Sequence, residues 1–257
     1  MTSPEELSAY ADRLLDSESC PDYPNALNGL QISSQKPVRA IAAAVDFSLR
    51  TIEETVRAEA NLLLVHHGMF WSGLGHHTGV AYRRLRLLIE HDVAVYSSHL
   101  PLDRHSSLGN NTLLARQLGL EPSGVFARHA DISIGVSGST DLETAELVRR
   151  AREFSRTCGG EIHTTTIAPG RRTKRWAMCT GAGASAETLH EAVTAGFDTM
   201  IVGEGPHWTA VSAEEHGISI IYAGHYATET LGVRALAQHL SEKFKLPWSF
   251  IDAPTGL

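Results

Sequence analysis

The sequence predicts an α/β protein built from two similar lobes. Apolar runs of strand length alternate with segments of helical periodicity, a turn-rich stretch near Gly124 divides this alternation, and short motifs of the first half recur in the second. With 257 residues, 42% of them hydrophobic and 20% charged, the chain can form one large domain or two smaller ones. We expect a first lobe of residues 1–124 plus about 223–257, and a second of residues 125–222.

In the first half, each expected strand is followed by a helix. Ser48 is a candidate N-cap for a helix that runs to about Ala60, and Gly119 is suited to close another. The expected strands are Val38–Val45, Leu62–Val65 and Val93–Ser97, and the further helices are Tyr82–Glu90 and Asn110–Leu118.

The second half repeats the pattern. Thr140 and Glu143 have the spacing of a capping box for a helix over Leu142–Phe154, and Gly170–Arg175 is expected as an exposed basic turn. The last helix carries an apolar face from Leu231 to Phe244. The other expected elements are the strands Ile132–Val136, Trp176–Cys179, Thr199–Val202 and Ile218–Tyr222, and the helices Ala186–Ala195 and Trp208–Glu215.

Two motif pairs suggest an internal repeat. Val65–Trp71 aligns with Val202–Trp208, and each follows an apolar strand. Further on, Tyr96–Asp103 and Tyr222–Glu229 share the form Tyr-x-x-His-x-x-x-carboxylate. A duplicated lobe explains both, and chance similarity between two strand–loop units is the alternative.

Composition limits the classes of function. No apolar run approaches the roughly 20 residues that span a bilayer, and the N-terminus lacks the features of a signal peptide, so we expect a soluble cytoplasmic protein without membrane contact. Cys20, Cys158 and Cys179 are too far apart for a zinc motif or a disulfide framework. The formal charge of −7 argues against non-specific binding to nucleic acid, although a local basic patch could still hold a phosphate.

The chain has 14 histidines, and several follow apolar strands. Polar residues at four expected strand ends would meet in one cleft, because parallel strands carry their ligand sites at their carboxyl ends. Adjacent side chains on an extended strand point in different directions, so a histidine pair fits two neighbouring metals better than one. The four strand-end positions are Asp46, His66-His67, His99 and His225.

The carboxylates extend this metal hypothesis. Glu229 lies four residues after His225 at a strand-to-helix turn, and Asp103 has the same spacing from His99. Two dications need bridging oxygens to offset their repulsion, and Asp103 and Glu229 are suited to that role. His66, His67 and His225 are then terminal ligands of a dinuclear site in the cleft between the lobes.

Other residues have two interpretations each. His99 is either a ligand or a hydrogen-bond donor to one, and Glu204 and His207 either face the cleft as proton-transfer groups or cap a helix. His76-His77 fits a solvated loop better than a site, and the Gly181–Ser185 stretch fits a packing turn better than an anion site.

Five short motifs follow one another along the chain: Asn28-Gly29-Leu30-Gln31, Leu64–His67, His99–Asp103, Gly203-Glu204 and Gly224–Glu229. In these motifs the sequence resembles the GTP cyclohydrolase 1 type 2 homologue family, also called the NGG-interacting-factor-three-like proteins. The resemblance covers nearly the whole chain and implies two α/β lobes, a dinuclear site and a toroidal hexamer formed as a trimer of dimers. It also implies that His66, His67, Asp103, His225 and Glu229 are the ligands. Leu27 and Gly68 depart from residues frequent in the family, where Asp and Pro occur.

Two functions compete. A metal-dependent hydrolase would attack a nucleotide-like substrate with activated water, and the basic residues from Arg171 to Arg175 would either meet phosphates or remain solvated. A metal-binding or regulatory scaffold would instead serve metal handling or partner docking. The mixture of imidazole and carboxylate suits two zinc, iron, manganese or nickel ions per subunit.

Overall fold

The computed structural model describes residues 2–257, which form two compact units. Unit 1 runs to Leu102 and resumes at Gly232–Ala253, and unit 2 comprises Asp103–Leu231 and Pro254–Leu257. The second unit thus begins before residue 124, because helix α5 (Asn110–Gln117) buries Leu114 and Ala115 in the core of unit 2. The return to unit 1 falls within α9 (His225–Phe244) rather than before it.

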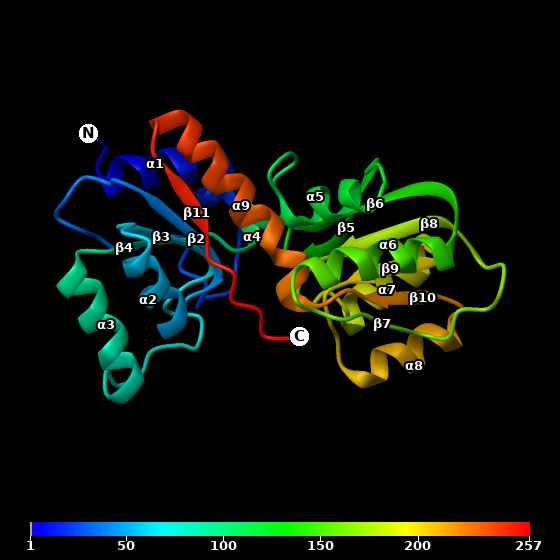
Figure 1. Cartoon of the computed structure of the whole chain (residues 1–257). Helices are drawn as coiled ribbons and strands as arrows, with labels where there is room; N and C mark the ends of the chain where they lie inside the picture. Colours follow the sequence, from blue (N-terminus) through cyan, green and yellow to red (C-terminus); the bar gives the residue numbers. More distant parts are fainter. Residues whose placement is uncertain (1) are drawn as a thin grey trace. The chain divides into compact units, whose positions relative to one another are not determined.

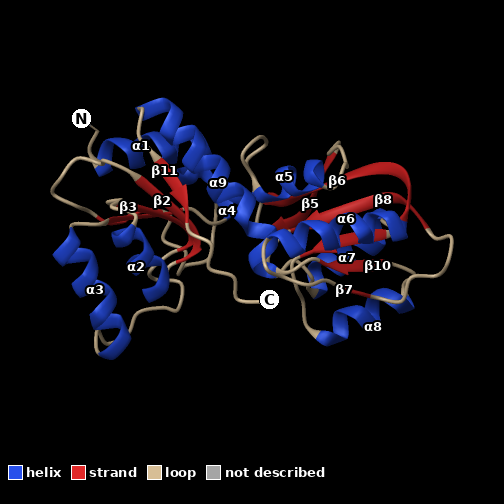
Figure 2. Cartoon of the chain, viewed as in Figure 1, coloured by secondary structure: helices blue, strands red, loops and turns tan. Residues whose placement is uncertain are grey.

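Unit 1 contains a five-stranded sheet in the order β1-β4-β3-β2-β11 (Figures 1 and 2). All neighbouring strands are parallel except β1, which pairs antiparallel with β4. The strands are β1 (Gly29–Ile32), β2 (Ile41–Asp46), β3 (Leu62–His67), β4 (Ala94–Ser97) and β11 (Trp248–Phe250). The helices are α1 (Pro4–Leu15), the short η1 (Ser17–Ser19), α2 (Leu49–Arg57), α3 (Gly79–His91) and the unit-1 part of α9, while α4 (Leu100–Asp103) spans the unit boundary.

Helices cover both faces of this sheet, and the central strands β2 and β3 are therefore apolar up to their carboxyl ends, as buried parallel strands require. One face packs Leu63 and Val65 against Ile52 of α2 and Leu88 of α3. Figure 1 shows α1 and α9 on the opposite side of the sheet. Tyr10 of α1 stacks on His239 of α9 there.

Unit 2 contains a six-stranded sheet in the order β5-β6-β8-β9-β10-β7. The parallel strands β8, β9 and β10 form its centre, and antiparallel pairs complete both sides. The strands are β5 (Gly124–His129), β6 (Ile132–Glu143), β7 (His163–Thr164), β8 (Arg172–Cys179), β9 (Thr199–Val202) and β10 (Ser219–Tyr222). The helices are α5, α6 (Thr144–Thr157), α7 (Ala186–Ala195), α8 (His207–Glu215) and the first turns of α9.

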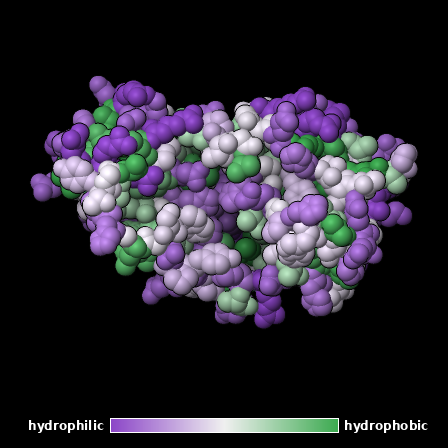
Figure 3. All heavy atoms as spheres, turned by 90° about the horizontal axis from the view of Figure 1, so that it is seen from below, coloured by the Kyte–Doolittle hydropathy of each residue, from purple (hydrophilic) through white to green (hydrophobic). Residues whose placement is uncertain are grey.

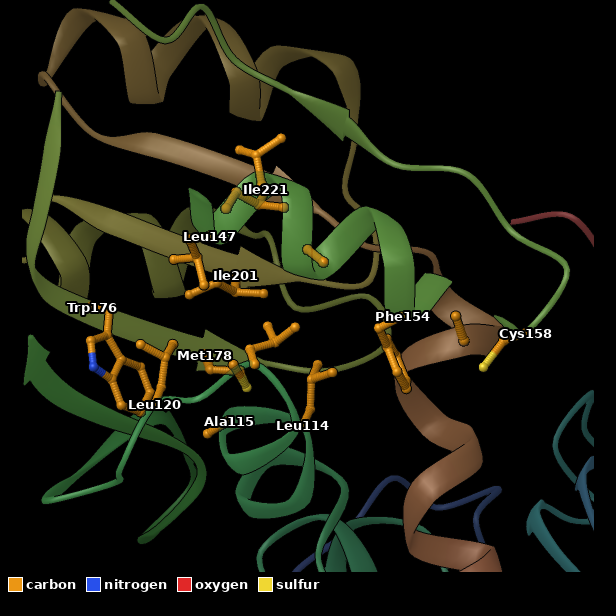
Figure 4. Packing of buried hydrophobic residues seen from close by; sticks show 14 residues of the cluster. Leu114, Ala115, Leu120, Leu147, Phe154, Cys158, Trp176, Met178, Ile201 and Ile221 are labelled. Carbon is orange, nitrogen blue, oxygen red and sulfur yellow. The ribbon is translucent and has the colours of Figure 1, made fainter. Parts of the chain in front are cut away.

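The core of unit 2 lies on both sides of its sheet. On one side, Leu114 of α5 and Leu147 and Phe154 of α6 pack against Trp176 and Met178 of β8 (Figure 4). On the other side, α7 and α8 cover a second apolar cluster. This two-sided packing explains the alternation of strands and helices in the sequence.

Two expected features around β6 are corrected by the structure. Thr140 and Glu143 form no capping box, because β6 continues to Glu143 and pairs with β8 as far as Arg172. α6 starts at Thr144 without a side-chain cap. The basic run after Gly170 is mostly strand rather than turn, and Arg172 forms an ion pair with Asp141.

The two units share a strand–helix–strand element, but their registers differ. Val65 and Val202 both face the side covered by the connecting helix. Tyr96 lies opposite Leu64 on the neighbouring strand, whereas Tyr222 lies opposite Val202. A shift of one residue reverses the face of a side chain, so the two tyrosines are not equivalent in position.

On the face drawn in Figure 3, apolar side chains are scattered among hydrophilic ones. Exposed apolar residues include Leu74, Ile89 and Val125. Among residues 2–257, no helix has the length and apolar character that a membrane crossing requires.

Candidate metal centre

Three histidines of unit 1 converge at the carboxyl ends of two neighbouring strands. His66 and His67 are the last residues of β3, and His99 follows β4. All three are buried, with exposed fractions of 0%, 7% and 7%. One potential ligand atom from each lies within 4.8 Å of those of the other two. The strand ends therefore form an imidazole cluster of the kind that the sequence predicts.

Each of these histidines is oriented through its Nδ1 atom. His66 Nδ1 donates to the carbonyl oxygen of Ser98 at 2.9 Å, because a carbonyl oxygen accepts only. His67 Nδ1 donates to Asp46 Oδ1 at 2.9 Å, on the opposite side of β3. His99 Nδ1 faces Asp22 Oδ1 at 2.8 Å in the same way. In the neutral form, each ring then has its proton on Nδ1 and its lone pair on Nε2.

Asp22 is a site residue that sequence reasoning missed. It accepts hydrogen bonds from the Leu100 amide and from Asn28 Nδ2, in addition to His99. Burial raises the pKa of Asp22, but these hydrogen bonds and the nearby imidazole lower it further, so its net pKa is depressed. Asn28 also accepts from the His99 amide, which gives the Asn28-Gly29-Leu30-Gln31 motif a structural role.

Aromatic rings border the histidine cluster. The Trp71 ring centroid lies 4.7 Å from that of His67 and 4.5 Å from that of His99. Tyr23 packs edge-on against Trp71. These rings restrict the rotation of the imidazoles, which favours a fixed ligand geometry.

Unit 2 holds the other predicted ligands. α9 begins at His225, and its first turn brings Glu229 Oε2 to 3.2 Å from His225 Nε2, as the four-residue spacing predicts. On the other side of the ring, His225 Nδ1 donates to Glu204 Oε1 at 2.8 Å. Burial lowers the pKa of His225, but Glu229 and Glu204 raise it more, to about 9.

Asp103 is also buried and held in place. Its Oδ1 accepts from Asn110 Nδ2 at 2.8 Å and from Thr180 Oγ1 at 3.5 Å. Burial, together with the charges of Asp103 and Glu229, raises the pKa of the Cys179 thiol. The negative charges of Asp103 and Glu229, which lie in different segments of unit 2, therefore both raise the pKa of the same thiol.

Gly181 allows the close approach of Glu229. It has a positive φ of 61°, and a Cβ at this position would collide with Glu229 Oε1. The turn that contains it leads into α7, where Ser185 and Thr188 form a capping box. This turn is thus a packing element that supports the acidic ligand rather than an anion site.

The remaining candidate residues have different surroundings in the structure. Glu204 is the acceptor for His225, which gives it an orienting role. His207 is the first residue of α8 and lines a cavity of unit 2. His76 and His77 are exposed in a loop, as expected.

The donor set fits divalent transition metals. Four histidines, His66, His67, His99 and His225, hold Nδ1 against an oxygen acceptor within their own unit. Metal-binding histidines characteristically donate one ring N–H to a carboxylate or carbonyl and bind the ion through the other nitrogen. Buried carboxylates accompany them at Asp103 and Glu229.

Sequence and structure comparisons identify the relatives of the chain. Residues 3–255 match the family described as Duf34/NIF3 (NGG1p interacting factor 3). The chain belongs to this family. A GTP cyclohydrolase 1 type 2 homolog from Deinococcus radiodurans is 39% identical to this NIF3-family chain over 238 residues, which cover 91% of it and 88% of the relative.

Two solved structures share the NIF3-family fold at 32% identity and full coverage of both chains. Protein ybgI, described as of unknown function, superposes with a TM-score of 0.89. The crystal structure of TTHA1606 from Thermus thermophilus gives a TM-score of 0.85. The α/β class and the family that the sequence motifs indicate are thus confirmed.

Proposed function

We propose that this NIF3-family protein binds two divalent transition-metal ions and hydrolyses a nucleotide-like substrate. The ligands of the proposal are His66, His67, Asp103, His225 and Glu229. The main support is the orientation of the histidines, because an Nδ1–H held by an oxygen acceptor directs the Nε2 lone pair to a cation. Zinc, iron, manganese and nickel all suit such a set of nitrogen and oxygen donors.

The course of the chain supports a centre with ligands from both units. Asp103 is the first residue of unit 2 and lies in α4, which begins in unit 1. His225 and Glu229 lie in the unit-2 part of α9, a helix that continues into unit 1. All three ligands thus lie close in sequence to a point where the chain passes from one unit to the other.

The protein's own residues supply orientation and proton transfer. Bound divalent ions supply Lewis acidity and make water a stronger nucleophile at neutral pH. Glu204 and Asp46 hold His225 and His67 in their ligand orientation. Glu204, His99 and His207 are the candidates for moving protons to and from substrate. The name GTP cyclohydrolase 1 type 2 homolog, carried by relatives 32 to 39% identical, supports a nucleotide-like substrate.

Metal analysis combined with an activity screen tests the proposal. Protein reconstituted separately with zinc, iron, manganese and nickel is expected to hold up to two ions per chain and to hydrolyse at least one nucleotide. His66→Ala should lose activity and chiefly one of the two ions, whereas His77→Ala, which removes an exposed loop imidazole, should keep both ions and activity. Zero metal after every reconstitution would remove the basis of the site. Full metal content without turnover of any nucleotide would favour a metal-handling or docking scaffold.

Assembly belongs to the same proposal. Family resemblance implies a hexamer made as a trimer of dimers, and light scattering during gel filtration measures the mass directly. A mass of six times 27.9 kDa is the expected result. A monomer at micromolar concentration would exclude this assembly.

A further inference from the structure

A cavity that lies wholly within unit 2 adjoins the His225–Glu204 pair. It has a volume of about 670 Å³, which lies in the usual range for small-molecule sites, roughly 300 to 1,000 Å³. Its walls come from the segment after α6, from β7, from the turn after β9, from the start of α8, from the end of β10 and from Gly256-Leu257. The polar side chains that line it are Glu161, His163, Thr164, Glu204, His207 and Tyr222.

The charges of this cavity disfavour phosphate. Two carboxylates, Glu161 and Glu204, line it, and its described lining includes neither lysine nor arginine. α8 begins at the cavity, and a helix N-terminus carries about half a positive charge, which two carboxylates outweigh. The N-cap of α8 is Pro206, which has no amide proton to offer to an anion.

The same carboxylates can accept hydrogen bonds from a ligand. Glu204 is bonded to His225 through Oε1, and its side chain is 44% exposed. Glu161 is exposed and forms no hydrogen bond or ion pair with another side chain in the described part of the chain. A carboxylate has two oxygens with about four acceptor positions, so each retains capacity for N–H donors.

We propose that this cavity binds the ring of a neutral or cationic nitrogen heterocycle that presents two adjacent N–H donors, as guanine does. The phosphates of a nucleotide are not needed for binding at this position. The inference rests on the proposed function, because Glu204 links the cavity to His225 and so places a bound ring beside a proposed metal ligand. It narrows the proposed substrates from nucleotides in general to compounds whose ring presents adjacent N–H donors to a carboxylate.

Calorimetry on the metal-reconstituted protein tests this with three probes. Guanosine is expected to bind at least as tightly as GTP, since phosphates add repulsion in this cavity. Inosine lacks the exocyclic amine and should bind about tenfold more weakly, because a carboxylate then loses one charged hydrogen bond. GTP that binds ten times more tightly than guanosine, equal affinity for inosine and guanosine, or no binding of guanosine would each overturn the inference.

A matched pair of variants locates the binding. Glu161→Gln should weaken guanosine binding about tenfold, because it exchanges an acceptor oxygen for a donor. Glu215→Gln removes the same charge from an exposed position at the end of α8, outside the cavity, and should leave binding unchanged. An unchanged affinity in Glu161→Gln would contradict the proposal.

Metal content, measured on the same samples, separates this inference from the proposed function. Glu161→Gln should retain the wild-type metal content, since Glu161 is not among the proposed ligands. Guanosine binding with the predicted preferences in a protein that holds no metal would support the cavity and overturn the hydrolase. Two ions per chain without guanosine binding would overturn the proposed role of the cavity and leave the proposed metal centre standing.

Discussion

At the scale of residues, the candidate centre depends on groups that are not among the proposed ligands. Asp46 and Glu204 accept the Nδ1–H of His67 and His225, and a backbone carbonyl does the same for His66. A carboxylate partner fixes the ring orientation and increases the basicity of the other ring nitrogen. The acceptors should therefore matter for metal affinity almost as much as the ligands.

Asp46→Asn tests this dependence. The amide lacks the charge that holds the Nδ1–H of His67, so metal affinity should fall about 10- to 100-fold without loss of the fold. Competition titration against a chromogenic chelator measures the affinity. Asp131→Asn, at an exposed position, is the control and should have no effect. Equal affinities in the two variants would show that Asp46 has no role in the site.

Glu229→Gln tests the bridging role of that carboxylate. A bridge screens two cations from each other, so its replacement by an amide should lower occupancy at both metal positions, whereas His66→Ala should chiefly empty one. Elemental analysis per chain is the readout, with circular dichroism to confirm that α9 still forms. Two ions retained at unchanged affinity by folded Glu229→Gln would contradict the bridge.

At the scale of elements, the turn between β8 and α7 positions the acidic ligand. Gly181→Ala adds a methyl group that collides with Glu229 Oε1, at a residue with φ of 61°. We expect both a loss of metal affinity and a destabilisation of about 1 to 3 kcal/mol.

Gly170→Ala provides a matched control for this variant. Gly170 has a similar φ of 73°, but a Cβ there meets no atom within 4 Å. It should cost similar stability through backbone strain and leave metal binding intact. Thermal denaturation and metal titration on both variants separate the two effects, and equal metal affinities would show that the contact with Glu229 is unimportant.

The elements that sequence predicts well are those with strong local signals. α7 and β9 have the predicted bounds. A capping box and an apolar helix face define α7, and a short apolar run defines β9. β1, β5, β7 and β11 were not predicted, because they lie at sheet edges where pairing partners rather than apolar pattern decide the structure. β6 exceeded its predicted end for the same reason, since its pairing with β8 continues through polar residues.

At the scale of the whole molecule, the sequence indicated the candidate ligands and two residues that orient them, Asp46 and Glu204, but not Asp22. The histidines follow apolar strands and the carboxylates keep a helical spacing, so both leave a local pattern. Asp22 leaves none, because it precedes His99 by 77 residues and only the tertiary fold brings them together. The boundary of unit 2 lies before the predicted residue 124 for a similar reason, since α5 packs in a core with residues of α6 and β8, which come later in the chain.

The proposed centre requires ligands from both units to act together, and a double-mutant cycle tests this. His67 belongs to unit 1 and Glu229 to unit 2. If both bind the same pair of ions, His67→Ala and Glu229→Gln should each weaken metal binding, and the double variant should lose much less than the sum of the two losses. Residues that share a partner are non-additive by about 0.5 to 3 kcal/mol, whereas independent sites add within about 0.5 kcal/mol.

The chelator-dependent change in melting temperature provides a second readout of the same cycle. Metal that binds only the folded protein stabilises it by mass action, so its removal should lower the melting temperature of the wild type. The shift should be reduced in each single variant, and the double variant should lose little beyond Glu229→Gln alone, because that substitution already lowers occupancy at both shared positions. His77→Ala keeps all the proposed ligands and should show the full shift. Losses that add in the double variant, both in affinity and in the shift, would mean that each unit binds its own metal and would exclude a shared dinuclear centre.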